Sequence, residues 1–190
     1  MKTHNILLVG VGGQGTILAS KILAEVATMQ GHDVKMSEIH GMAQRGGSVV
    51  TQVRMGEKVY SPLIEEGDAD NIVAFEKLEA LRYVHYLREG GSIVVNDQQI
   101  DPMTVITGAH VYPPEVMEKL QERASDVLVI DALQLAREVG SIRAVNVVLL
   151  GALARKMDIT KESWLEAIRR TVPAKFLALN LQAFEAGYSG

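Results

Sequence analysis

A glycine-rich segment near the start of the chain is the first candidate for chemistry. After the apolar run of residues 6–9, the sequence reads Gly10-Val11-Gly12-Gly13-Gln14-Gly15. This is a G-x-G-x-x-G pattern, and residues 16–29 after it have the apolar spacing of a helix. Glycines allow a tight turn, and the unpaired N–H groups at a helix start attract an anion. The segment therefore indicates a phosphate or dinucleotide site, or glycines that only let the helix pack closely on a sheet.

Residues 37–48 form a second segment with reactive side chains, among them Glu38, His40, Gln44 and Arg45. Glu38 lies about 20 residues after the glycines, where a ribose-binding acid is expected in a dinucleotide site. Arg45 is followed by two glycines, an arrangement that suits a phosphate or a carboxylate. Equally, Arg45 would brace a rigid docking loop by pairing with Glu38. His40 is either a proton carrier or an ordinary hydrogen-bonding histidine.

Other chemistries find less support in the residues. The chain has no cysteine, so its own thiolates cannot form a disulfide or ligate an iron–sulfur cluster. Gly67-Asp68 resembles the start of a thiamine-diphosphate motif, but Ala69 stands where that motif has glycine. The histidines other than His40 show no metal-ligand spacing. Asn146, at the head of a very apolar helix, is a buried amide or faces a ligand near the glycine turn. We predict no catalytic residue and no metal site in this chain.

The elements that would position these residues alternate between strand and helix. Strands are expected at residues 6–9, 34–39, 48–55, 71–75, 92–96 and 127–131, with a hairpin from 48–55 to 58–60. Helices are expected at residues 16–29, 78–87, 115–124, 132–139 and 145–157, after Thr160, and through Leu177, Leu181 and Phe184. Gly90-Gly91 would close the second helix, and residues 145–157 are apolar enough for a central helix or a subunit interface. These elements predict a three-layer α/β/α Rossmann-like fold with a mostly parallel but mixed sheet.

Composition limits the class of protein. The 190 residues suffice for one domain, and no composition break marks a linker, so residues 1–190 are expected to form a single domain. A net charge of −4 with scattered basic residues gives no case for nucleic acid or an anionic membrane as a partner. The apolar run near the start is too short for a secretory signal or a membrane span. A cytoplasmic location is expected.

Taken together, three segments give the chain a family resemblance. The glycine turn with Gln14, the loop Met42-Ala43-Gln44-Arg45-Gly46-Gly47-Ser48, and Asn146 before Leu150-Gly151-Ala152-Leu153 resemble the gamma-type subunit of 2-oxoacid:ferredoxin oxidoreductases. The likeness extends over essentially the whole chain. Residues 37–47 and the ending from Val172 onward are most similar to the indolepyruvate branch, whose small subunit is called beta.

The resemblance implies a subunit without chemistry of its own. Enzymes of this family decarboxylate a 2-oxoacid on thiamine diphosphate, pass electrons through iron–sulfur clusters to ferredoxin, and transfer the acyl group to coenzyme A. A larger partner subunit would hold thiamine diphosphate, magnesium and the clusters, and this chain would line the coenzyme A side and support assembly. The residues carried over as cofactor-binding candidates are Gly12, Gly13, Gln14, Gly15, Met42, Gln44, Arg45 and Gly46.

Two other functions fit parts of the sequence. The glycine turn with Glu38 suits a free-standing Rossmann-type NAD(P)-dependent dehydrogenase, and a noncatalytic nucleotide- or coenzyme-A-binding module is a third reading. Under the subunit hypothesis, the chain alone is inactive, and exposed apolar surface on the helix of residues 145–157 or on the C-terminal helix forms the interface. The isolated chain would then associate with itself through that surface.

Overall fold

Six strands form a single sheet in the computed structural model, which describes residues 3–41 and 47–190. The strands are β1 (His4–Val11), β2 (Asp33–His40), β3 (Ser48–Gly56), β4 (Ala69–Ala74), β5 (Leu87–Asn96) and β6 (Asp126–Ile130). Their order across the sheet is β2-β3-β1-β4-β5-β6. Only β3 runs against its neighbours, since it pairs antiparallel with both β1 and β2, whereas β1, β4, β5 and β6 pair in parallel. The mixed sheet predicted from the sequence is confirmed.

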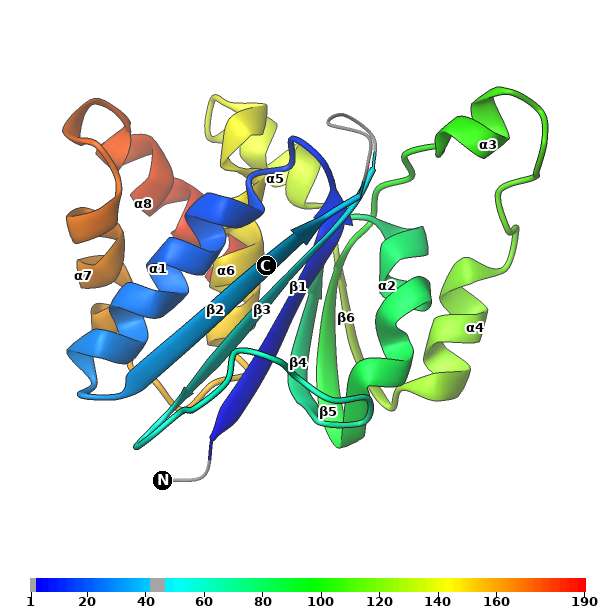
Figure 1. Cartoon of the computed structure of the whole chain (residues 1–190). Coiled ribbons are helices and arrows are strands. Elements are labelled where there is room, and N and C mark those ends of the chain that lie inside the picture. The colour runs from blue at the N-terminus through cyan, green and yellow to red at the C-terminus, as the bar shows by residue number, and fades with distance from the viewer. Residues whose placement is uncertain (1–2, 42–46) are drawn as a thin grey trace.

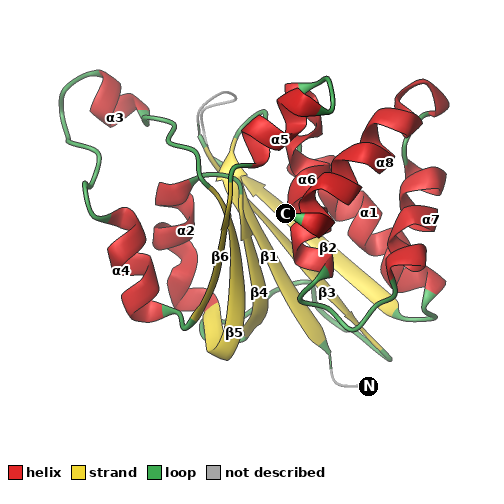
Figure 2. Ribbon diagram, turned by 180° about the vertical axis from the view of Figure 1, so that it is seen from behind, coloured by secondary structure: helices red, strands yellow, loops and turns green. Residues whose placement is uncertain are grey.

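Helices cover both faces of the sheet, which confirms the three-layer arrangement (Figures 1 and 2). The larger layer contains α1 (Thr16–Met29), α5 (Ala132–Glu138), α6 (Val145–Ala154), α7 (Lys161–Thr171) and α8 (Ala174–Ser189). The opposite layer contains α2 (Lys77–Tyr83) and α4 (Val116–Arg123), and the short α3 (Met103–Ile106) lies beyond it. Side chains of β1 alternate between the layers: Ile6 and Leu8 face the larger one, Leu7 and Val9 the smaller one.

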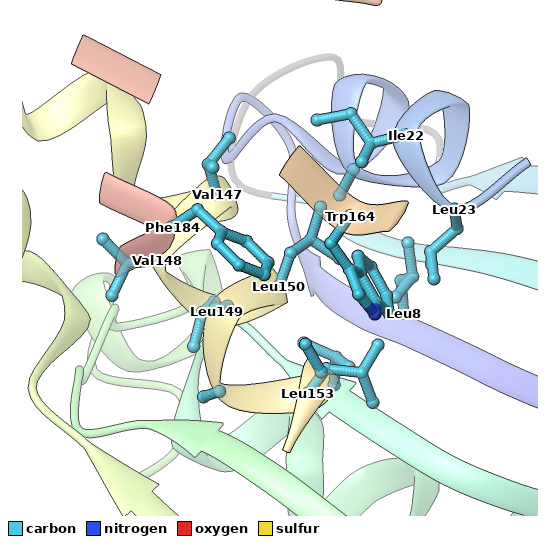
Figure 3. Close-up of a cluster of buried hydrophobic side chains, with 14 of the residues drawn as sticks. Leu8, Ile22, Leu23, Val147, Val148, Leu149, Leu150, Leu153, Trp164 and Phe184 are labelled. Atoms are coloured by element: carbon cyan, nitrogen blue, oxygen red, sulfur yellow. The ribbon is translucent and has the colours of Figure 1, made fainter. Parts of the chain in front are cut away.

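Helix α6 is the centre of the larger layer. Every one of its residues is buried, because the sheet, α1, α5 and α8 surround it. Figure 3 shows Val147, Leu150 and Leu153 of this helix among Trp164, Phe184 and other buried side chains. The expectation that residues 145–157 expose an interface is therefore wrong, since tertiary packing uses this apolar surface inside the subunit. Within the described part of the chain, no helix is long and apolar enough to cross a membrane.

Two glycines let α6 and α8 approach each other closely. A Cβ added at Gly187 would overlap the carbonyl oxygen of Val148, and one at Gly151 would overlap that of Phe184. Neither glycine has a positive φ, so space and not backbone conformation requires them. On α8, Phe176 remains 45% exposed, so the C-terminal helix keeps some apolar surface at its first turn.

The hairpin expected from residues 48–55 to 58–60 does not form. Both edges of β3 are already paired, with β2 and with β1, so residues 58–60 find no open edge. Residues 57–68 instead run as an irregular segment on the sheet face that α2 and α4 also cover. Ile64 N–H donates to Gln52 Oε1 at 2.5 Å, and Arg54 Nη1 donates to the carbonyl of Leu63 at 2.8 Å.

The second helix also ends earlier than predicted. Helix α2 stops at Tyr83, a 3-10 turn covers Val84–Tyr86, and β5 begins at Leu87, so Gly90 and Gly91 lie inside a strand. A Cβ at Gly91 would lie 2.8 Å from Leu87 Cδ1 and 3.0 Å from the Asp70 carbonyl oxygen. Glycine is needed there for close packing of β5 against β4, not for ending a helix.

Candidate functional site

The glycine turn joins β1 to α1 at the carboxyl edge of the parallel strands. Gly13 and Gly15 have φ angles of 98° and 87°, in the left-handed region that favours glycine. Gly15 is the residue before the first turn of α1, and its ideal Cβ would lie 2.8 Å from Asn146 Nδ2. Both conformation and space therefore require glycine at position 15. The turn leaves the start of α1 next to an open region, where ligands bind in sheets of this kind.

Gln14 fastens the turn to the neighbouring strand. Its Oε1 accepts from the Val11 N–H at 2.7 Å. Its Nε2 donates to the Phe75 carbonyl at 3.0 Å and lies 3.4 Å from Gln98 Oε1. The side chain thus links the end of β1 to the segments that follow β4 and β5. Gln14 braces the turn, and its side chain is also part of the cavity wall described below.

Asn146 meets the glycine turn from α6. The side chain is buried, Nδ2 donates to the Gly15 carbonyl at 3.1 Å, and Oδ1 accepts from the Val147 N–H at 3.0 Å. The expected hydrogen-bonded buried amide is confirmed. Asn146 also lines a cavity at the glycine turn, and its contact with a ligand there stays a prediction.

The second segment predicted from the sequence joins β2 to β3, and the structure describes its two ends. Four site residues predicted from the sequence lie outside the described residues: Met42, Gln44, Arg45 and Gly46. At the base of the loop, the Gly41 N–H donates to the Ser48 carbonyl at 2.8 Å. The Gly12 N–H donates to the Gly47 carbonyl at 2.9 Å. The two segments selected from the sequence therefore meet at one edge of the sheet.

A cavity of about 520 Å³ opens beside the glycine turn. The turn forms one wall, Gln98 and Ile100 after β5 form another, and Arg143 and Asn146 border it from the α5–α6 region. The Arg143 guanidinium is exposed and forms no ion pair with any residue in the described ranges. A cation beside free N–H groups at a helix start suits an anionic group. Arg143 was not singled out from the sequence, where one basic residue before an apolar helix gives no distinctive signal.

Glu38 and His40 do not join this cavity. His40 Nε2 lies 2.5 Å from Glu38 Oε1, and Thr51 Oγ1 donates to Glu38 Oε2 at 3.0 Å. Because β3 is inserted between β1 and β2, the strand carrying Glu38 lies about 10 Å from β1. In a dinucleotide-binding sheet these strands are neighbours. The position of Glu38 therefore does not favour the dehydrogenase alternative.

Two buried acids at the start of α2 were missed in the sequence. Glu76 is 1% exposed and accepts from the Glu79 N–H at 3.0 Å. Glu79 Oε2 accepts from Ser48 Oγ at 2.5 Å, and Arg82 Nε lies 3.4 Å from Oε1. Burial raises the pKa of the Glu79 carboxyl, while the hydrogen bond from Ser48 and the charge of Arg82 oppose the rise. Sequence reasoning had no signal for these acids, because their burial depends on tertiary packing.

Among residues 3–41 and 47–190, neither a metal centre nor a thiamine site at Gly67-Asp68 is formed. Within the described ranges, no group of three or more His, Asp or Glu side chains is arranged to hold a metal ion. Asp68 accepts from Asn5 Nδ2 at 2.9 Å in the turn before β4, at the opposite edge of the sheet from the glycine turn. The Gly67-Asp68 pair therefore has a structural role here.

Comparison with known proteins places the chain among oxidoreductase subunits. Residues 5–190 match the family described as Pyruvate ferredoxin/flavodoxin oxidoreductase. "Indolepyruvate oxidoreductase subunit IorB" of Thermococcus kodakarensis is 43% identical, with 98% of this chain and 95% of the relative covered. "Pyruvate/ketoisovalerate oxidoreductases common subunit gamma" of Thermococcus litoralis is 29% identical, with 92% of this chain and 89% of the relative covered.

Solved structures share the fold. The gamma subunit of keto/oxoacid ferredoxin oxidoreductase from Geobacter sulfurreducens superposes with a TM-score of 0.73 at 26% identity, covering 98% of this chain and 96% of that one. The 2-oxoglutarate:ferredoxin oxidoreductase from Magnetococcus marinus, solved with 2-oxoglutarate, coenzyme A and succinyl-CoA, also gives a TM-score of 0.73, at 25% identity. All of this chain is covered in that match, but only 31% of the larger protein.

Proposed function

The chain belongs to the pyruvate ferredoxin/flavodoxin oxidoreductase family and is the small, gamma-type subunit of a 2-oxoacid:ferredoxin oxidoreductase; we propose that its complex acts on indolepyruvate or a related aryl pyruvate. The support is the higher identity to a subunit named for indolepyruvate, 43%, than to a gamma subunit named for pyruvate and ketoisovalerate, 29%. Both similarities extend over nearly the whole chain, so a shared segment does not account for the difference.

A larger subunit carries the redox chemistry in this proposal. Thiamine diphosphate with magnesium would supply decarboxylation there, and iron–sulfur clusters would pass electrons to ferredoxin. The residues of this chain fit none of these groups: there is no cysteine, and Asp68 is held by Asn5 beside Ala69. The small subunit, with residues 1–190 acting as one unit, then serves binding and assembly.

The cavity at the glycine turn is the proposed contact with coenzyme A. The observation that carries this step is Arg143, a guanidinium without an ion-pair partner in the described chain, beside the start of α1. The phosphate groups of coenzyme A carry the negative charge that such donors attract. Among the residues proposed from the sequence, Gly13, Gln14 and Gly15 line the cavity. Gly12 and the loop residues Met42, Gln44, Arg45 and Gly46 belong to the same proposal.

The first experiment is anaerobic co-expression with a candidate larger subunit, sought among the genes next to this one. Coenzyme-A-dependent viologen reduction is measured with indolepyruvate and with pyruvate. We expect activity that requires both chains and a preference for indolepyruvate. Activity of this chain alone with a nicotinamide cofactor would overturn the proposed dependence on a larger subunit, and a preference for pyruvate would overturn the substrate assignment.

Arg143 tests the coenzyme site in the same complex. Arg143→Ala is expected to raise the KM for coenzyme A about tenfold, because a charge-assisted hydrogen bond to phosphate is lost. The KM for the 2-oxoacid should not change. Arg137→Ala is the matched control, since Arg137 is exposed on α5 and does not line the cavity. An unchanged KM for coenzyme A in Arg143→Ala would contradict binding in this cavity.

A further inference from the structure

The segment between β5 and α4 is loosely attached to the rest of the subunit. Figure 1 shows α3 well away from the sheet, and Met103, Ile106 and Val111 are exposed by 59%, 65% and 86%. The backbone hydrogen bonds that residues 105–110 donate in the described structure go to residues 102–105, within the segment itself. The position of this segment therefore depends on how its two ends are held.

Both ends meet at one buried carboxylate. Glu76 Oε1 accepts from the Ile100 N–H at 3.2 Å and from the Tyr112 hydroxyl at 2.6 Å. The Glu79 N–H donates to the other oxygen. Glu76 forms no ion pair with a described residue, so these donors are what compensates the carboxylate for its burial. Burial and the neighbouring Glu76 carboxylate raise the pKa of Tyr112, so the phenol keeps its proton and remains a donor.

This carboxylate also adjoins the cavity wall. Ile100 and Gln98 line the cavity together with Asn146, and the Gln98 carbonyl accepts from the Lys77 N–H at 3.0 Å, next to Glu76 in the chain. The preceding residue, Phe75, receives hydrogen bonds from Gln14 and Asn96. Residues 75–77 thus connect the glycine turn to Gln98 and Ile100 in the wall of the same cavity.

We propose that Glu76 is a positioning residue for the cavity: by holding Ile100 and Tyr112, it fixes the part of the wall formed by Ile100 beside the glycine turn. The inference rests on the proposed binding of coenzyme A in this cavity. A ligand placed between two walls loses affinity when one wall becomes mobile, because binding must then also order that wall. Glu76 itself does not touch the ligand in this scheme, and its loss should affect binding and not the chemical step.

Tyr112→Phe is the mildest test, because it removes one donor and keeps the ring. In the assembled complex, the KM for coenzyme A should rise about fivefold, the value expected for one lost hydrogen bond, while kcat and the KM for the 2-oxoacid stay constant. Glu76→Gln should have a larger effect, since its amide cannot supply acceptors to all three donors. Tyr86→Phe is the control, because Tyr86 is also partly buried but lies near the opposite edge of the sheet.

Amide hydrogen exchange of residues 99–112 in the full chain measures how firmly Glu76 holds Ile100 and Tyr112, independently of coenzyme A. Exchange should be faster in Tyr112→Phe than in wild type or Tyr86→Phe, and unchanged exchange would overturn the proposal. Faster exchange with a wild-type KM would overturn it too, provided that Arg143→Ala raises the KM, and would leave Glu76 as a purely structural residue. A wild-type KM in Arg143→Ala as well would instead show that coenzyme A binds elsewhere, which overturns the site and the positioning role together.

Discussion

The glycine turn and the α6–α8 crossing both depend on glycine, but for different physical reasons. At Gly13 and Gly15 the backbone has a positive φ, which residues with a Cβ atom rarely adopt. At Gly151 and Gly187 the backbone is ordinary helix, and the partner helix occupies the space where a Cβ would lie. The first pair shapes a turn that borders a cavity, whereas the second pair allows two helices to pack in close contact.

The surroundings of the two regions differ accordingly. Hydrogen bonds from Gln14 and Asn146 hold the turn, and a cavity of about 520 Å³ remains open beside it. The crossing lies among fully buried apolar side chains such as Leu149 and Phe184. Substitutions at the crossing should therefore lower the free energy of unfolding strongly. Substitutions at the turn should lower it less but weaken the proposed binding of coenzyme A more.

The largest expected effect is at the crossing. Gly187→Ala should lower the free energy of unfolding by about 3 kcal/mol or more, because the new methyl group forces two packed helices apart. Helix propensity alone would favour alanine by roughly 1 kcal/mol, so any loss must come from the contact. Denaturant unfolding measures the change, with exposed Gln182→Ala on α8 as the control. A stabilised Gly187→Ala protein would disprove the close approach.

A smaller effect is expected in the turn, where two substitutions separate conformation from space. Gly13→Ala should cost about 1 kcal/mol for the positive φ alone, since nothing lies within 4 Å of its ideal Cβ. Gly15→Ala should cost about 2 kcal/mol, because it also displaces the buried Asn146 amide. Equal losses in the two variants would show that Asn146 moves away without cost.

The buried Glu79 on α2 should make the free energy of unfolding depend on pH, with a smaller effect than the substitutions above. Burial raises the pKa of Glu79 above 4.5, so the folded protein keeps this proton to a higher pH than the unfolded chain does. The stability that the protonated Glu79 carboxyl contributes is fully present below pH 4.5, and it is lost as the pH rises through the pKa of the folded protein. Glu79→Gln does not titrate, so its stability relative to wild type should increase from pH 4.5 to neutral. Urea unfolding at several pH values tests this, and a constant difference would contradict it.

The smallest effect on stability is expected at the cavity mouth. Arg143→Ala should change the free energy of unfolding by less than about 0.5 kcal/mol, because the exposed guanidinium forms no ion pair in the described chain. Thermal unfolding of the isolated chain checks this beside the kinetic test. A substantial loss of stability would show that Arg143 stabilises the fold. It would then contradict the assignment of the cavity to binding and of the α6–α8 crossing to stability.

Much of the fold could be predicted from local patterns. The apolar runs of β1, β4, β5 and β6 identify their own strands, and Thr160 caps α7 as expected, accepting from the Ser163 N–H. The errors occurred where distant contacts override local signals. Gly91 lies in a strand because the chain pairs with β4 on both sides of it, at Leu87 and Ser92. Residues 58–60 form no strand because β3 has no free edge.

The candidate site was predictable only in part, for the same reason. The sequence by itself determined the glycine turn and the absence of thiolate ligands, because each depends on residue type and near neighbours. Tertiary structure alone decided that Arg143 borders the cavity, that Glu76 and Glu79 are buried, and that β3 separates Glu38 from the turn. Those features arise when segments far apart in the chain pack together, and nothing in the spacing of residues encodes which partners meet.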